Sequence, residues 1–163
     1  MAKQKSKEAG ADDIRIVCRN RRAAHEYEIL DTLECGLVLT GTEVKSLREN
    51  QAMIEDAYVS VTDNEVWLIG SDIPEYTKGN RLNHKPRRDR KLLLHKREIS
   101  KFCGKAEQKG FTLIPLKLYF KSGRAKIEIA VARGRQLHDK RAAKKDAEVT
   151  RDIRREMANR RKD

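Results

Sequence analysis

Short segments in which apolar and polar residues alternate recur between residues 14 and 132. The clearest is 127–131, with isoleucine or valine at every second position. Two more, 58–61 and 66–69, flank the sequence TDNE at 62–65, which is typical of a hairpin turn. Because a period of two residues indicates half-buried strands, we expect about six short strands. Such strands predict an all-β fold with short helices, a closed or nearly closed antiparallel barrel.

Two features indicate where the strands break. Residues 27–29 and 37–39 carry the same alternation, and we expect a turn between them near Cys35-Gly36. Pro115 lies inside the apolar segment 113–120. Since proline cannot donate a hydrogen bond to a strand ladder, it predicts a sheet edge or a bulge at that point.

Two short helices are predicted among the strands. The first covers 43–49 and is capped by Thr42. The second covers 99–106, where apolar residues follow the i, i+3, i+4, i+7 spacing of a helical face. Gly110 is well placed to end this second helix, because glycine adopts the left-handed backbone found after many helices.

The composition changes at residue 133. From there to residue 163 the chain holds 12 basic and 6 acidic residues, and its apolar stripe contains only Val149, Ile153 and Met157. So narrow a stripe does not stabilise an isolated helix in water. We therefore expect a disordered arm at 1–13, the barrel at 14–132, and a basic tail at 133–163. The tail is expected to be disordered when free and to become helical on a charged partner.

Positive charge is the main functional signal. Lys and Arg total 37 and Asp and Glu total 25, which gives a formal net charge of +12. Nine basic residues fall within 80–101 against two acidic ones, and a smaller cluster contains Arg19, Arg21 and Arg22. Clusters of this kind bind phosphates with salt-sensitive affinity. We therefore expect nucleic acid as the partner.

Several other classes find no support. No apolar run approaches the length of a membrane span, and the polar N-terminus lacks the apolar core of a secretory signal. Cys18, Cys35 and Cys103 form no CxxC pair, so a zinc site is not expected. We expect reduced thiols, no cofactor, no metal, no membrane contact and a cytoplasmic location.

RNA is favoured over duplex DNA. The sequence contains no pair of recognition helices, basic zipper or zinc finger that would enter a major groove. Aromatic residues are few, and Tyr27, Tyr58, Trp67 and Phe111 lie at positions that look buried. This pattern argues against a general single-strand binder, which stacks bases on aromatic rings. It favours recognition of a folded RNA by its shape and backbone.

Catalytic residues are not evident, although a small nuclease remains an alternative. His84 and His95 lie in the basic segment, but we favour their interpretation as exposed polar residues near phosphates over a nuclease role. The acidic residues show no paired-metal pattern. Glu34 allows two interpretations: it could accept hydrogen bonds from a base edge, or it could form a structural ion pair.

Five motifs closely resemble the SsrA-binding protein family, also called small protein B: NRRAAHEYEI (20–29), ECGLVLTGTEVKSLRE (34–49), RDRKLLLHKREI (88–99), KGFTLIPLKLYFKSGRAKIEIAVARG (109–134) and HDKR (138–141). The resemblance implies an OB-like barrel with a basic tail. It also implies a bacterial, non-enzymatic protein that binds transfer-messenger RNA and brings it to stalled ribosomes. An ordinary ribosomal protein with a barrel and a tail is the remaining alternative.

The resemblance also implies roles for single residues. Four positions match family contacts to the transfer-RNA-like domain: Asn20, Glu34, Leu93 and Lys126. Six basic residues of the same motifs would contact phosphates: Arg21, Arg22, Lys45, Arg48, Arg90 and Lys91. In the tail, the residues expected to face small-subunit ribosomal RNA, at the decoding centre and in the empty message channel, are Gly134, His138, Asp139, Lys140, Arg141 and Ile153. We expect a monomer that carries one RNA.

Overall fold

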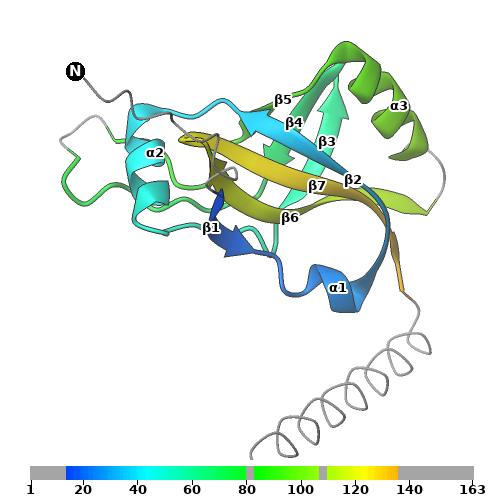
Figure 1. Cartoon of the computed structure of the whole chain (residues 1–163), viewed down its shortest axis with the longest axis horizontal. Helices are drawn as coiled ribbons and strands as arrows, with labels where there is room; N and C mark the ends of the chain where they lie inside the picture. Colours follow the sequence, from blue (N-terminus) through cyan, green and yellow to red (C-terminus); the bar gives the residue numbers. More distant parts are fainter. Residues whose placement is uncertain (1–13, 80–82, 107–109, 136–163) are drawn as a thin grey trace, which may run out of the picture.

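The computed structural model describes residues 14–79, 83–106 and 110–135 (Figure 1). Seven strands and three helices lie within these residues. In chain order they are β1 (Ile14–Arg19), α1 (Ala23–Glu26), β2 (Tyr27–Leu37), α2 (Gly41–Arg48), β3 (Tyr58–Thr62), β4 (Glu65–Ile69), β5 (Arg90–Leu93), α3 (Lys96–Ala106), β6 (Phe111–Lys121) and β7 (Arg124–Gly134). The strand β7 thus runs two residues past Ala132, where the apolar alternation ends.

Six strands close into a ring, and every pairing is antiparallel. The order is β6, β3, β4, β5, β2 and β7, and β7 pairs again with β6. The seventh strand, β1, pairs with β6 beside the ring. The prediction of an all-β antiparallel barrel with short helices is therefore confirmed. Helix α2 lies at one end of the sheet, and α1 and α3 lie at two other, separate places around it (Figure 1).

The expected hairpin is confirmed, whereas the expected turn near Cys35-Gly36 is wrong. In the turn between β3 and β4, Asp63 and Asn64 have φ angles of 52° and 59°, a left-handed backbone that these residue types tolerate. Strand β2 instead continues through residue 36, paired with β7. A bulge between Ile29 and Asp31 shifts the alternation of side chains by one residue, so Tyr27 and Ile29 lie on the outer face of the barrel. In the sequence, this shift resembles a turn between two strands.

Pro115 produces a bulge and not an edge. The register of β6 against β7 shifts between Pro115 and Lys117. The opposite side of β6 pairs with β1 and with β3, so this strand is covered on both sides. Because the register shifts at Pro115, the ladder does not need the hydrogen bond that proline cannot donate.

Both predicted helices are present with displaced starts. Helix α2 begins at Gly41, and the Thr40 backbone N–H donates to Glu43 Oε2 over 2.7 Å, so Thr42 is not the cap. Helix α3 begins at Lys96, three residues before the apolar pattern, because Glu98 accepts a hydrogen bond from the His95 backbone. Gly110 lies just before β6 with φ +94°.

Two apolar clusters hold the barrel together. The larger one fills the ring and includes Leu47, Leu68, Leu118, Ile127 and Ile129. The smaller one lies under α1 and contains Ala23, Ile114, Ala130 and Ala132, with Tyr27 and Leu116 packed against it. Tyr58 was expected to be buried, but 49% of it is exposed on the outer side of β3. None of the helices in the described part of the chain is long and apolar enough to cross a membrane.

Candidate nucleic-acid interface

Three of the residues expected to contact RNA converge on one surface. They come from three neighbouring strands: Glu34 from β2, Leu93 from β5 and Lys126 from β7. Gly36 of β2 pairs with Leu93 on one side and with Lys126 on the other. Glu34 lies two residues before Gly36 and thus on the same face. All four residues line a groove of about 800 Å³.

The Glu34 carboxylate is surrounded by donors. The Tyr119 hydroxyl of β6 donates to Glu34 Oε2, and Lys126 Nζ lies 3.5 Å from Oε1. Lys121 Nζ lies 3.8 Å from Oε2. The hydrogen bond from Tyr119 and the two ammonium groups outweigh desolvation and hold the pKa of Glu34 below its usual value. Glu34 is therefore ionised at neutral pH, and 36% of its side chain is still exposed.

A glycine allows Leu93 to lie across β2. A Cβ atom at Gly36 would meet Leu93 Cβ at 3.2 Å, which is closer than ordinary van der Waals contact. The absence of that atom brings the Leu93 side chain, 53% exposed, over the strand. The exposed Leu93 side chain therefore gives the groove an apolar surface beside the carboxylate. Leu33 and Leu37 also line the groove, but they pack against the interior cluster of the barrel.

Cationic side chains and α3 complete the rim of the groove. Arg124 and Lys126 line it from β7, and His95 and Glu98 line it from the start of α3. Neither Arg124 nor Tyr119 was among the predicted site residues. The period-two pattern of 117–121 already places Tyr119 on the same face as its charged neighbours, which is the signal that could have identified it.

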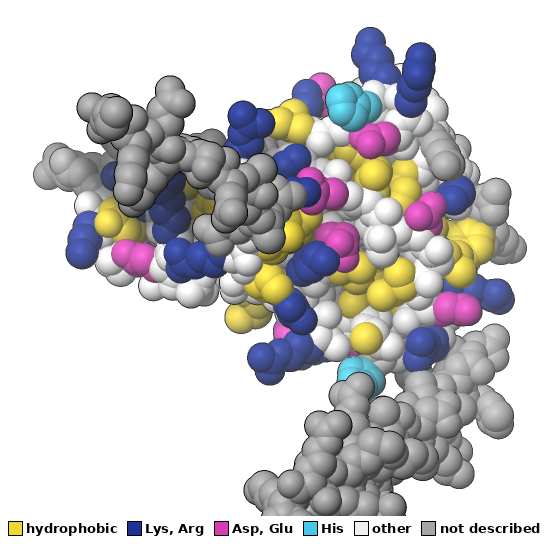
Figure 2. Space-filling model, in the orientation of Figure 1, with side chains coloured by type: hydrophobic (Ala, Val, Ile, Leu, Met, Phe, Trp, Pro, Cys, Tyr) yellow, Lys and Arg dark blue, Asp and Glu magenta, His cyan; other side chains and the backbone are white. Residues whose placement is uncertain are grey.

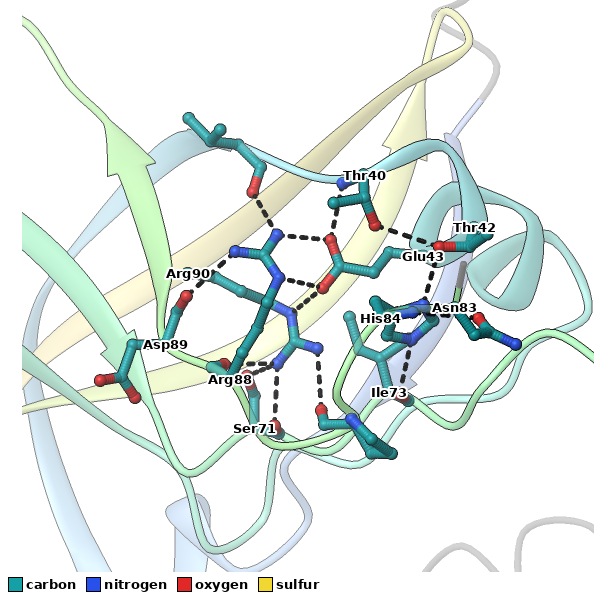
Figure 3. Close-up of polar contacts among 12 residues, drawn as sticks. Thr40, Thr42, Glu43, Ser71, Ile73, Asn83, His84, Arg88, Asp89 and Arg90 are labelled. Carbon is teal, nitrogen blue, oxygen red and sulfur yellow. Dashed lines mark hydrogen bonds and ion pairs between the residues drawn. The ribbon is translucent and has the colours of Figure 1, made fainter. Parts of the chain in front are cut away.

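Arg90 is not on this surface, contrary to our expectation. Its side chain is fully buried, and Nε donates to Glu43 Oε1 over 3.0 Å (Figure 3). Its other nitrogens donate to the backbone carbonyls of Ser71, Pro86 and Arg88 and to the Ser71 hydroxyl. A guanidinium that is enclosed and paired in this way cannot reach a phosphate. The basic motif at 88–91 therefore combines a core residue with surface residues.

Other cations of the 80–101 segment are also neutralised locally. Arg88 shares Glu43 with Arg90 and lies 2.6 Å from Oε2. Arg87 pairs with Asp72 at 3.0 Å, and Lys91 pairs with Glu65 across β4 and β5. The number of basic residues in this segment therefore overstates the positive charge that it offers to an RNA. His84, considered for a nuclease, is buried between Thr42 and the Ile73 carbonyl, with both contacts at 2.9 Å.

Asn20 and the arginines after it form a separate region at the end of β1. The Asn20 side chain accepts from the Ala23 backbone N–H over 3.0 Å and donates to the Pro115 carbonyl over 3.1 Å. It thus anchors the chain that enters α1. Arg21 is exposed, and Arg22 is exposed and lies 3.1 Å from Asp56. Asn20 does not line the groove of Glu34.

The remaining predicted residues fall in two places. Lys45 and Arg48 are exposed on α2, where Lys45 Nζ lies 5.4 Å from the centre of the Tyr76 ring. Gly134 is the last residue of β7, exposed and paired with Tyr27. The other tail residues, His138, Asp139, Lys140, Arg141 and Ile153, lie outside the described residues.

The charged side chains on the face seen in Figure 2 are mixed. Lys and Arg side chains are spread around this face, with acidic and hydrophobic side chains between them. Such a surface suits selective contacts better than a continuous basic stripe would. Among the described residues, no group of three or more His, Cys, Asp or Glu side chains could hold a metal ion. Burial raises the pKa of Cys18 to about 11, so it remains a protonated thiol at neutral pH.

The closed ring and the mixed polar groove on its outer strands define a small OB-like β-barrel protein. Residues 17–159 match the family model described as SmpB protein, and the chain belongs to this family. A protein of Frankia casuarinae named SsrA-binding protein is 53% identical over 91% of this chain and 93% of its own length. A protein of Mesorhizobium japonicum with the same name is 55% identical, over 85% of this chain and 87% of its own.

A solved structure is similar to the barrel. It is described as "tmRNA-SmpB: a journey to the center of the bacterial ribosome", and it superimposes with a TM-score of 0.63 at 49% sequence identity. The similarity covers 74% of this chain and 85% of the other. At that level of identity the likeness extends beyond the fold to the family.

Proposed function

We propose that this chain is a non-enzymatic adaptor that binds the transfer-RNA-like domain of transfer-messenger RNA and delivers it to stalled ribosomes. Family membership supports this function, as do relatives that are named for SsrA binding. The similar solved structure, described as tmRNA-SmpB and the bacterial ribosome, points to the same two partners. The protein would act in the bacterial cytoplasm as a monomer with one RNA and without a cofactor.

The convergence of Glu34, Leu93 and Lys126 is the observation that carries the proposal. These residues are 59 and 33 positions apart in sequence, yet strand register places them around one groove. The surface offers an acceptor, an apolar side chain and a cation, which suits contacts to bases and backbone of a folded RNA. Arg21, Arg22, Lys45, Arg48 and Lys91 would add phosphate contacts around the barrel.

Residues 136–163 would supply the second contact, with small-subunit ribosomal RNA. The basic composition of this segment suits such a partner. Strand β7 ends at Gly134, and the Arg135 backbone N–H donates to the Glu26 carbonyl over 2.9 Å. A chain that stops after Arg135 keeps that hydrogen bond and the complete β7 strand.

Truncation after Arg135 tests the two separate contacts. The truncated protein is expected to bind the transfer-RNA-like domain with unchanged affinity and to lose tagging of stalled peptides. The substitution of Asp139-Lys140-Arg141 by alanines in the full chain should reproduce much of the loss. Normal tagging by the truncated protein would contradict the role given to the tail.

An incubation of labelled RNA with the full-length protein, with and without EDTA, tests the non-enzymatic part. The RNA is expected to be recovered intact in both samples. Specific cleavage would contradict an adaptor and would favour a small nuclease. Sedimentation in high salt provides a second test, because a constitutive ribosomal protein stays on all ribosomes, whereas a rescue factor is present on few.

A further inference from the structure

The groove beside Glu34 has the size and lining of a small-ligand site. Its volume of about 800 Å³ lies within the roughly 300–1,000 Å³ range of such sites. Its lining includes the exposed side chain of Leu93 and the charged residues Glu34 and Lys126. A flat, partly apolar molecule with a polar edge fits such a lining.

The carboxylate is fixed in place and keeps capacity to accept further hydrogen bonds. Tyr119, which is 3% exposed, donates to Oε2, and Lys126 Nζ lies 3.5 Å from Oε1. A carboxylate has about four acceptor positions on its two oxygens. Glu34 lines the groove with 36% of its side chain exposed, so the carboxylate can accept hydrogen bonds in addition to the one from Tyr119.

An ionised carboxylate only accepts, so the ligand must donate. Among the four RNA bases, guanine alone carries two adjacent donors on its Watson–Crick edge, the ring N1–H and the exocyclic amine. On the same edge, the guanine O6 atom is an acceptor, which matches the Lys126 ammonium beside Glu34. Cytosine, adenine and uracil each place an acceptor next to their donor and would leave one carboxylate oxygen facing an acceptor.

We propose that this groove holds one unstacked guanine of the bound RNA, with its Watson–Crick edge on Glu34 and its ring against Leu93. Tyr119 is the positioning residue that orients the carboxylate. In a base pair the Watson–Crick edge is already occupied, so this guanine must lie in a loop or a bulge of the RNA. Arg124, which also lines the groove, would contact a flanking phosphate. The inference rests on the proposed function, since it assumes that RNA covers this surface.

Inosine provides the test, because it lacks only the exocyclic amine of guanosine. Each unpaired guanosine of the transfer-RNA-like domain is replaced in turn, and Kd is measured for the full-length wild type, Glu34→Ala and Glu128→Ala. Glu128 is a matched control, since it lies opposite Glu34 in the strand register and pairs with Lys117 at 2.8 Å. At one position, inosine should weaken binding to the wild type and to Glu128→Ala about tenfold or more. At that position it should have no effect on Glu34→Ala.

Tyr119→Phe tests the positioning role separately. It removes the hydroxyl and keeps the ring, so the ratio of the Kd for the inosine RNA to the Kd for the guanosine RNA should fall to less than threefold while the protein remains folded. A ratio equal to that of the wild type would overturn the role of Tyr119.

Two further outcomes would overturn the guanine site and can be told apart. If inosine changes no Kd by more than twofold while Glu34→Ala still weakens binding, the RNA surface stands and the guanine site is wrong. If the wild type binds the transfer-RNA-like domain no better than an unrelated RNA hairpin, the proposed function fails together with the site.

Discussion

Arg90 and Glu43 form an ion pair in which both side chains are fully buried, with Arg90 Nε 3.0 Å from Glu43 Oε1. The pair joins β5 to α2, and Arg88 and the Thr40 backbone N–H also donate to Glu43 (Figure 3). Each lone pair that burial removes from water is thus satisfied within the protein. The network fixes the strand that carries Leu93 relative to the helix that carries Lys45 and Arg48.

Glu43→Ala is expected to lower the free energy of unfolding by about 3–5 kcal/mol, because it leaves the buried Arg90 charge without its partner. Urea denaturation monitored by circular dichroism measures this change. Arg22→Ala is the control, since the Arg22–Asp56 pair lies on the surface. It should cost about 1 kcal/mol or less. Equal losses in the two variants would contradict the structural role of the buried pair.

Acid is expected to destabilise the barrel through Glu43. Burial alone would raise the pKa of Glu43, but the hydrogen bonds from Arg88 and Thr40 and the charges of Arg90 and Arg88 outweigh it, so the folded-state pKa lies below the ordinary value. The stabilisation is therefore complete above the unfolded pKa of about 4.3 and is lost as pH falls through the lower folded pKa.

The free energy of unfolding of Glu43→Gln, measured in urea at a series of pH values, checks this dependence. The variant should be less stable than the wild type at pH 7, and its stability should fall less steeply below about pH 4.3. Parallel curves for the two proteins would show that other carboxylates control the acid transition.

Asn20→Ala is expected to act mainly on stability. Its side chain makes hydrogen bonds to Ala23 and Pro115 and does not line the groove. Loss of a side-chain acceptor before a helix costs about 0.5–2 kcal/mol. Glu34→Ala, whose side chain is partly exposed, should change thermal unfolding much less. A stability of Asn20→Ala equal to that of the wild type, with weaker RNA binding, would instead make Asn20 a direct contact.

Gly36→Ala is expected to weaken RNA binding without altering any charge. The new Cβ would press against Leu93 Cβ at 3.2 Å and displace that side chain or separate β2 from β5. Overpacking of this kind costs about 1–3 kcal/mol of stability. Gly41→Ala is the control, because no atom of the described residues lies within 4 Å of the added Cβ. Calorimetry and RNA titration on both variants separate the two effects.

The period-two pattern predicted the barrel because burial inside a closed ring imposes it on every strand. Ile127 and Ile129 are fully buried, as their alternation indicated. The same pattern could not locate the bulge at 29–31, since one extra residue changes the face of a side chain without changing residue types. The face that a residue near a bulge occupies depends on how its strand pairs with the neighbouring strand. This pairing cannot be read from the residue pattern of one strand.

The site was predicted in part, and the failures have one cause. Glu34, Leu93 and Lys126, which the family resemblance named as RNA contacts, line one groove, and their contact with RNA stays a prediction. Arg90 was placed among the RNA contacts because basic residues in a run look alike in sequence. Its burial depends on Glu43, 47 positions away, which no local pattern indicates. Tyr119 was missed because its partner Glu34 is 85 positions away.

The most direct test of the RNA surface is the Kd of the transfer-RNA-like domain for Glu34→Ala beside Glu128→Ala. Each substitution raises the formal net charge from +12 to +13, so attraction between the protein and a polyanion would increase in both. If Glu34 accepts hydrogen bonds from the RNA, Glu34→Ala should bind about tenfold or more weakly despite the added charge. Glu128→Ala should bind as well as the wild type or better. Equal or tighter binding by Glu34→Ala would contradict the contact on which the proposed surface depends.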